Sequence, residues 1–197
     1  DDELENDDDE MEGEPEENDN EMEDGADEDD DTDEAAEPVA AVLQADLSQS
    51  FIAFTGKKGD LVSHEGKFNR FTVEVNTVDD VPLSMNASID IASMETDSDR
   101  LTDHLQAPDF FDAATHGTAT FRSSTVTSLG DSRYTVSGPL TIKGVTNDVS
   151  FTAEMNAAYL LLSYNLDRTA FGVGPAPEGV KAIDAVVPIE AKIVFAQ

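Results

Sequence analysis

Three histidines are the side chains of this sequence best suited to bind a metal or to transfer a proton. His64, His104 and His116 are far apart along the chain and lack the close spacing of a helical zinc site. A mononuclear metal site would have to bring these histidines together from separate loops, with nearby carboxylates as further ligands. The carboxylates that a loop could contribute there are those of Asp103, Asp109 and Asp112. Hydrogen bonding within loops is the simpler interpretation of all three histidines, and we favour it.

Motifs for nucleophilic catalysis and for phosphate binding are absent from the sequence. It contains no G-x-S-x-G turn and neither a G-x-G-x-x-G motif nor a P-loop. The lack of cysteine removes thiol catalysis and cysteine-ligated zinc together. We therefore predict that the protein is not an enzyme and requires no cofactor.

Acidic residues are concentrated at the N-terminus. Residues 1–37 contain 24 of the 44 aspartates and glutamates and none of the 11 lysines and arginines. The net charge of −33 therefore divides into −24 for this segment and −9 for the remainder. Such a segment cannot bury enough apolar surface to offset the entropy lost on ordering. We predict a disordered, low-complexity acidic tail over residues 1–40 and one domain over residues 41–197.

The role of the acidic tail is open to several interpretations. A solvated spacer is the simplest, and a cation-binding arm, a tether from a membrane anchor and an adaptation to salt are the alternatives. The chain begins with Asp1 rather than methionine, which predicts that a secretory signal or lipoprotein leader has been removed. We expect an exported protein of the periplasm or cell envelope, with a membrane tether through the removed segment as one alternative.

The charge also argues against two classes of partner. Nucleic acid requires a basic surface, and the sequence contains no cluster of lysine or arginine. Anionic membranes attract basic rather than acidic segments. No apolar run approaches the ~18 residues of a membrane-spanning helix. The sequence sets no oligomeric state, and a dimer is compatible with it.

Most of residues 43–197 alternate between apolar and polar side chains. Seven or eight such runs, separated by turn residues, are typical of an antiparallel sandwich or barrel. The clearest runs cover residues 50–54, 71–75, 83–91, 134–142, 149–155, 160–166 and 187–195. Clean alternation gives each strand one wet face and one dry face. We therefore predict an all-β fold.

Two local features interrupt or connect these strands. The pair Lys143–Gly144 predicts a hairpin turn between Leu140 and Phe151. Residues 93–105 lack β-type alternation and predict a short helix, with Leu101 and Leu105 on one face. Asp97 or Ser98 could cap its start, and Pro108 ends it. Pro38 and the alanines up to Val42 predict the junction between tail and domain.

Three residues stand out inside this pattern. Arg168 continues the inward parity of Leu162, Tyr164 and Leu166, and a buried arginine needs an acceptor. We expect that acceptor to be Asp184 or Asp90, with a ligand phosphate or quinone oxygen as the alternative. Phe110 and Phe111 are adjacent in a loop, where one ring could line an entrance while the other fills the core, or both could belong to the core.

Short motifs between residues 50 and 172 follow one another in an order and spacing that point to a known family. They are Ser50-x-Ile52-x-Phe54, His64-Glu65-Gly66-x-Phe68, Ile89-Asp90-Ile91-x-Ser93-Met94-x-Thr96, His104-Leu105-x-x-x-Asp109-Phe110-Phe111-Asp112, Ala119-Thr120-Phe121-x-Ser123, Gly138-x-Leu140-Thr141-Ile142-Lys143-Gly144-Val145-Thr146 and Asp167-Arg168-x-x-Phe171-Gly172. Over residues 45–195 the chain resembles the YceI-like family. The resemblance implies an eight-stranded antiparallel, lipocalin-like barrel whose interior holds a long apolar chain, typically a polyisoprenoid, in an exported protein.

Together, the alternation and the resemblance predict that the barrel binds a long-chain lipid (a polyisoprenoid, an isoprenoid quinone or a fatty acyl chain) as a carrier or sequestering protein. The predicted lipid-binding residues are Phe54, Phe71, Met85, His104, Phe110, Phe111, Phe121, Leu140, Ile142, Phe151, Tyr164 and Arg168. The main alternative is a solid, non-catalytic barrel whose tail acts as spacer or cation-binding arm. An enzyme that acts on a lipid headgroup through His104 and a metal is the weakest hypothesis.

Overall fold

The computed structural model describes residues 37–59, 62–179 and 182–196. The acidic tail lies outside the described residues as far as residue 36, and the compact unit begins at Glu37. Within the described ranges, no helix is both long enough and apolar enough to cross a bilayer.

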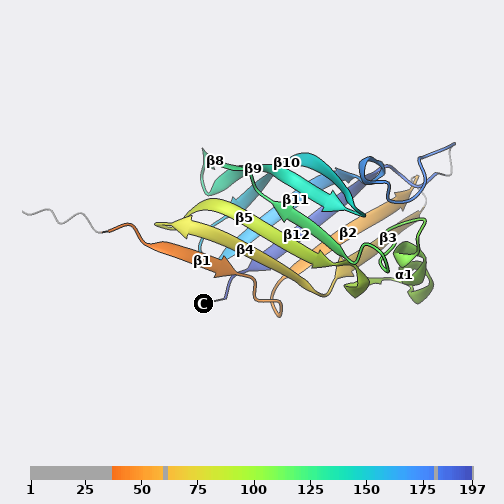
Figure 1. The fold of residues 1–197 in the computed structure, drawn as a ribbon, viewed down its shortest axis with the longest axis horizontal. Helices are drawn as coiled ribbons and strands as arrows, with labels where there is room; N and C mark the ends of the chain where they lie inside the picture. The colour runs from red at the N-terminus through yellow and green to blue at the C-terminus, as the bar shows by residue number, and fades with distance from the viewer. Residues whose placement is uncertain (1–36, 60–61, 180–181, 197) are drawn as a thin grey trace, which may run out of the picture. The chain divides into compact units, whose positions relative to one another are not determined.

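The described part of the chain contains twelve strands, one α-helix and two short 3-10 helices (Figure 1). The strands are β1 (Ala40–Gln44), β2 (Phe51–Lys58), β3 (Val62–Phe68), β4 (Phe71–Val78), β5 (Val81–Asp90), β6 (Met94–Thr96), β7 (Thr118–Arg122), β8 (Thr125–Gly130), β9 (Arg133–Ile142), β10 (Val145–Met155), β11 (Tyr159–Asp167) and β12 (Val186–Val194). The helices are η1 (Ile91–Ser93), α1 (Asp99–Gln106) and η2 (Arg168–Phe171).

All twelve strands belong to one antiparallel sheet that curls on itself (Figure 1). Its order is β1-β4-β5-β7-β9-β10-β11-β12-β2-β3-β6, and β8 pairs with β9 beside this path. A bridge between Ala45 and Phe195 joins the end of β1 to the end of β12, so the two sides of the sheet meet there. The predicted all-β, lipocalin-like fold is confirmed, with twelve strands where eight were expected. The additional strands include the three-residue β6 and the mostly exposed β8, which are too short or too polar to alternate clearly.

The predicted hairpin at Lys143–Gly144 is confirmed. Ile142 pairs with Val145, which leaves a two-residue loop between β9 and β10. Both loop residues have positive φ, 51° at Lys143 and 74° at Gly144, as a type I′ turn requires.

The predicted helix over residues 93–105 is correct only in its second half. Residues Met94–Thr96 form β6 and pair with the end of β3. Helix α1 therefore begins at Asp99, and Ser98 is its N-cap residue without a side-chain cap hydrogen bond. Three residues of strand pairing override the weak local helix signal there. The helix ends at Gln106, two residues before Pro108, as expected.

The start of the first strand and the facing of Leu83 also differ from the sequence prediction. Pro38 and the alanines up to Val42 were expected to form a junction, but β1 already begins at Ala40 and pairs with β4. Leu83 was expected on the same face as Met85, yet 58% of its surface is exposed. A register shift between Asn76 and Thr77 of β4 leaves Leu83 without a partner. Such a bulge reverses the facing of the residues before it, and alternation alone does not reveal it.

Gly138 allows β9 to change partners from β7 to β8. Leu140 of β9 pairs with Phe121 of β7, whereas Ser137 pairs with Thr125 of β8. A Cβ atom on Gly138 would overlap the carbonyl oxygen of Arg122 and lie 2.8 Å from the backbone nitrogen of Ser124. Neither backbone atom can move without breaking strand pairing.

Gly138→Ala is therefore expected to lower the free energy of unfolding by about 2 kcal/mol, the cost of overpacking a filled site. Urea denaturation monitored by circular dichroism measures it. Gly56→Ala is the matched control, because its Cβ would meet nothing closer than 4.0 Å. Equal stability of the two variants would contradict this account of Gly138.

Candidate functional site

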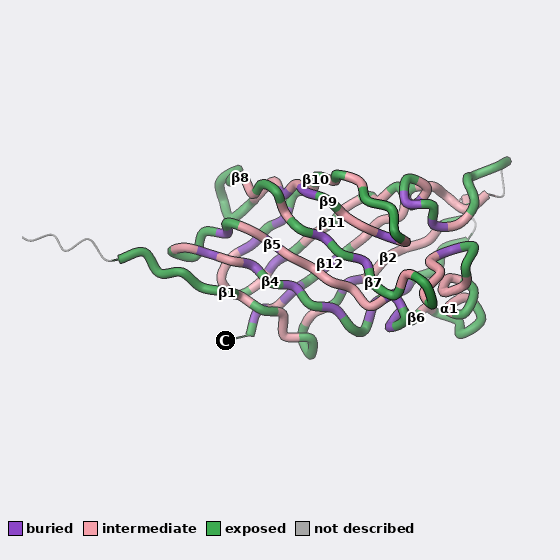
Figure 2. The backbone as a smooth tube through the Cα atoms, viewed as in Figure 1, coloured by how far each residue is buried: buried purple, intermediate pink, exposed green. Residues whose placement is uncertain are grey.

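The interior of the curled sheet contains a cavity of about 370 Å³. This volume lies within the range of about 300–1,000 Å³ typical of small-molecule sites. The lining is almost entirely apolar, and it comes from ten of the strands, together with residues of all three helices, rather than from one loop cluster. Figure 2 shows buried positions alternating with exposed ones along these strands, as expected for strands with one inward face.

The cavity extends along the barrel. On β11 the lining residues are Leu160, Leu162, Tyr164, Leu166 and, just beyond the strand, Arg168. Their partners on β12 also line the cavity, and they are Ile193, Ala191, Ile189 and Val187. Eight residues of antiparallel strand span about 27 Å. The lined interior is therefore long and narrow.

One end of the barrel is filled and the other carries the opening. Val75, Val136, Met155 and Phe195 are fully buried at the end where β1 meets β12. The exposed residues of the lining all belong to the opposite end, where β2 ends, β3 begins and α1 packs. They are Lys57, Lys58, Val62, His64 and His104. We call this end, defined by these five residues, the mouth.

Inward residues between the two ends are only half-buried. Phe54, Leu140, Phe151 and Leu162 belong to this group, although strands surround them. No other side chain covers them, because they face empty space. The barrel is therefore hollow in its middle section.

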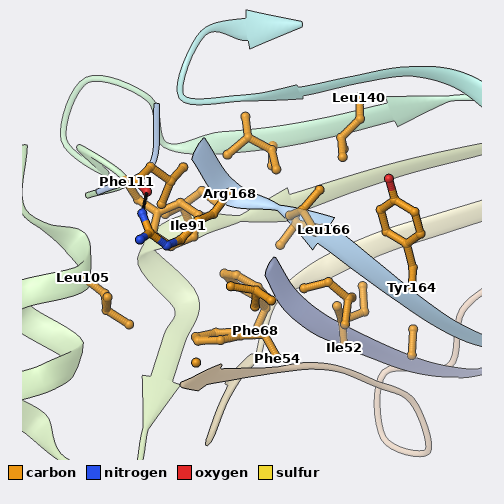
Figure 3. Close-up of a pocket in the computed structure, with 18 of the residues that line it drawn as sticks. Ile52, Phe54, Phe68, Ile91, Leu105, Phe111, Leu140, Tyr164, Leu166 and Arg168 are labelled. Carbon is orange, nitrogen blue, oxygen red and sulfur yellow. Dashed lines mark hydrogen bonds between the residues drawn. The ribbon is translucent and has the colours of Figure 1, made fainter. Parts of the chain in front are cut away.

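Two groups of aromatic rings line this section. Phe54 contacts Phe68 with ring centroids 5.6 Å apart, and Phe68 meets Phe111 edge-on at 6.5 Å. Figure 3 shows Phe54 and Phe68 side by side. The ring of Phe54 lies over Gly66, whose missing Cβ provides the space. A second group joins Phe151 to Phe121 at 5.2 Å and to Tyr164 at 5.9 Å.

Phe110 lines the cavity next to the loop that follows η2. Its side chain is 4% exposed, and its ring meets the imidazole of His104 with centroids 4.8 Å apart. A Cβ on Gly174 would lie 2.7 Å from this ring, and Gly174 has a φ of 70°. Phe110 is thus buried while Phe111 is half-buried, and both line the cavity.

Arg168 is buried and bound by backbone carbonyls. Its Nε donates to Asp184 O at 2.9 Å, and its Nη2 donates to Ile183 O at 2.9 Å. Its Nη1 donates to Val173 O at 2.7 Å and to Pro175 O at 2.9 Å. Burial lowers the pKa of this guanidinium, and the nearby charges of Asp167 and Asp184 oppose that change.

The expected carboxylate partner of Arg168 was wrong. Asp184 accepts through its backbone oxygen rather than its carboxylate, and Asp90 pairs with Arg70 at 2.8 Å. Asp167 positions Arg168 from the N-terminal side, since its carboxylate accepts from the hydroxyl and the backbone nitrogen of Thr169. These bonds hold the pKa of Asp167 below its usual value.

Lys143 fastens two loops near the mouth to the barrel wall. Its Nζ donates to Pro108 O at 2.9 Å and to Gly172 O at 3.1 Å. Pro108 follows α1, and Gly172 follows η2. The β9–β10 turn therefore fixes the segments that carry Phe110 and Arg168.

Of the twelve predicted lipid-binding residues, eleven line the cavity. Phe71 does not: it is buried in the apolar core at the start of β4, opposite Ile89. Alternation specifies the face of a strand but not whether that part of the face reaches the hollow section. The prediction omitted His64, Lys57 and Lys58 at the mouth. Lys58 continues the alternation of Ile52, Phe54 and Gly56, which was the available signal.

The three histidines do not converge. His64 Nδ1 lies 2.9 Å from Asp97 Oδ2, His104 stacks on Phe110, and His116 lies against the turn at Gly144. Within the described ranges, no three histidine, aspartate or glutamate side chains gather in a way that could hold a metal ion.

The fold and the cavity define a class of protein, the antiparallel β-barrel with a long apolar interior. The model of the YceI-like domain matches residues 43–195, and the chain belongs to that family. Among curated relatives, it is 32% identical over 106 residues to a UPF0312 protein of Ectopseudomonas mendocina, covering 53% of this chain and 52% of the relative. A UPF0312 protein of Vibrio vulnificus is 32% identical over 96 residues, covering 48% and 51%. The matches thus span about half the length of these relatives.

Solved structures support the same fold. BcnA of Burkholderia cenocepacia superimposes with a TM-score of 0.70 at 29% identity, covering 77% of this chain and 99% of BcnA. A polyisoprenoid binding domain of Saccharophagus degradans superimposes with a TM-score of 0.61 at 16% identity, covering 80% and 98%. At this low identity the second similarity shows the fold alone.

Proposed function

We propose that this domain binds a long-chain apolar lipid inside the barrel, as an exported carrier or sequestering protein. Polyisoprenoids, isoprenoid quinones and fatty acyl chains are the candidate ligands. One observation carries the proposal, namely the hollow apolar interior about 27 Å long. A compact headgroup site would not need such a length, whereas an extended chain would fill it.

The energetics of chain burial are sufficient for this function. Each methylene transferred from water contributes about 0.8 kcal/mol, so about 20 carbons contribute about 16 kcal/mol. Micromolar affinity requires about 8 kcal/mol net, and association costs at least about 4 kcal/mol. The polyisoprenoid binding domain with the same fold supports the choice of ligand class.

Lipid carried through purification is the direct test. The protein, purified without detergent, is expected to show in native mass spectrometry an added mass that organic extraction removes. The extracted protein should then take up geranylgeraniol or palmitate with one-to-one stoichiometry. A protein that is always empty and takes up neither chain would contradict the proposal.

Export is part of the same proposal. Fractionation of cells that produce the protein from its native gene is expected to place it in the periplasm or cell envelope. Recovery entirely with a cytoplasmic marker enzyme would contradict export while leaving lipid binding intact.

A further inference from the structure

Charge in the cavity lining differs from charge in the rest of the domain. The side chains there that carry or can acquire positive charge are those of Lys57, Lys58, His64, His104 and Arg168. In the part of the chain that the structure describes, no aspartate or glutamate lines the cavity. Yet residues 38–197 contain 20 acidic residues and only 11 lysines and arginines. Burial disfavours charges of either sign, so an apolar lining alone does not explain this selection of sign.

The strand register places positive side chains together at the mouth. Lys58 is the last inward residue of β2, and its partner on β3 is Val62. His64 is two residues further along β3, so it is the diagonal neighbour of Lys58 on the same face. Diagonal neighbours in an antiparallel pair lie about 7–8 Å apart, within reach of long side chains. Lys57 also lines the cavity at the mouth.

Of the other three groups, Arg168 and His64 already have acceptors, and the ring of His104 packs against that of Phe110. The guanidinium of Arg168 is bound by four carbonyls, and His64 is paired with Asp97. Among the described residues, the remaining ion pairs are Lys67–Glu95 and Arg70–Asp90, so neither Lys57 nor Lys58 belongs to one. Within the described ranges, the two lysines are therefore ammonium groups of the mouth that a ligand can engage.

We infer that the ligand is an amphiphile whose apolar chain occupies the barrel and whose anionic headgroup, a phosphate or a carboxylate, is bound by Lys57 and Lys58. This inference rests on the proposed function and adds the headgroup chemistry. An ammonium group donates charge-assisted hydrogen bonds to anionic oxygens. Such pairs strengthen beside an apolar rim that excludes part of the water, and a neutral headgroup gains little from them.

Matched ligands with the same chain isolate the headgroup contribution. One pair is geranylgeranyl monophosphate and geranylgeraniol, and the other is palmitate and hexadecanol. Affinities for the full chain follow from displacement of the neutral fluorescent probe N-phenyl-1-naphthylamine. At low ionic strength, the anion of at least one pair is expected to bind about tenfold or more tightly than its alcohol, equivalent to about 1.4 kcal/mol. Salt should reduce this ratio, because exposed charges are screened.

The double variant Lys57→Met/Lys58→Met removes the two ammonium groups and keeps side chains of similar length. Its preference for the anion is expected to fall below threefold, with affinity for the alcohol unchanged. The control is Lys67→Met/Lys192→Met, which changes the net charge equally but lies on exposed positions outside the lining. It should keep the full preference.

The outcomes separate this inference from the proposed function. Equal binding of anion and alcohol by the unmodified protein, or a preference that survives in the double variant, overturns the headgroup assignment and leaves lipid binding standing. Failure of all four ligands to bind overturns both. A preference in only one pair supports the inference and identifies the headgroup as phosphate or as carboxylate.

Discussion

Replacing Arg168 with methionine is expected to lower the free energy of unfolding by at least about 3 kcal/mol. Methionine fills a similar volume but donates no hydrogen bond. The four carbonyls that Arg168 binds are then left without this donor, and they belong to Val173, Pro175, Ile183 and Asp184. A hydrogen bond to a charged group contributes about 1.5–3 kcal/mol, and a buried acceptor left without a partner costs about 1–3 kcal/mol. Water can hydrate part of the loop in the variant, so the expected loss of stability is smaller than the sum of these costs. Urea denaturation gives the value, provided that the m-value is unchanged.

Arg70→Met provides the comparison for Arg168→Met. Arg70 also binds an acceptor, Asp90, but its side chain is 64% exposed. Exposed ion pairs contribute at most about 1 kcal/mol, so this variant should remain within that limit. If Arg168→Met were no less stable than Arg70→Met, the buried guanidinium would not be holding the loop.

Replacing Ala191 with tryptophan is expected to weaken binding of chains of 16 carbons or more by at least about 100-fold. Ala191 lies on β12 between Leu162 and Ile52, and it lines the cavity. It is four residues, or about 13 Å, deeper than Val187. An indole ring there would occupy the inner half of the cavity. Exclusion of only about four methylenes is enough for a 100-fold loss.

Two controls separate blockage from damage to the fold. Ligands with eight carbons end before Ala191, and Ala191→Trp should bind them within about threefold of the unmodified protein. Lys192→Trp adds the same ring to an exposed neighbouring position outside the lining and should bind all chain lengths normally. Isothermal titration with a series of chain lengths measures both. Unchanged binding of palmitate by Ala191→Trp would mean that the chain does not enter the barrel.

The facing of most strand residues could be predicted from the sequence. Alternation placed Phe54, Phe151 and Tyr164 inside, and all three line the cavity. The prediction worked because one face of each strand is wet and the other dry, which leaves a period of two in the sequence. Leu83 departs from it because a bulge inserts one unpaired residue, and a bulge has no compositional mark at this position.

For Arg168, the sequence predicts the burial of the side chain but not its hydrogen-bond acceptors. Its parity correctly predicted an inward, buried side chain. Its acceptors are backbone carbonyls, which every residue carries, so no residue type identifies them in advance. The hollow interior could not be predicted from the sequence either, because the same mixture of large and small residues can fill a barrel or leave a channel. Phe71 shows the consequence, since it is buried in the core but does not line the cavity.

A cavity that opens at one end also controls how fast cargo is exchanged. Because the exposed lining residues all lie at the mouth, a bound chain has to be withdrawn over its whole length before it is free. The dissociation rate should then fall about fourfold with each methylene that leaves the barrel into water. Long cargo would therefore stay bound through dilution. Its release would be rapid only beside a bilayer or another acceptor that shelters the chain as it emerges, so the dwell time would depend on the destination.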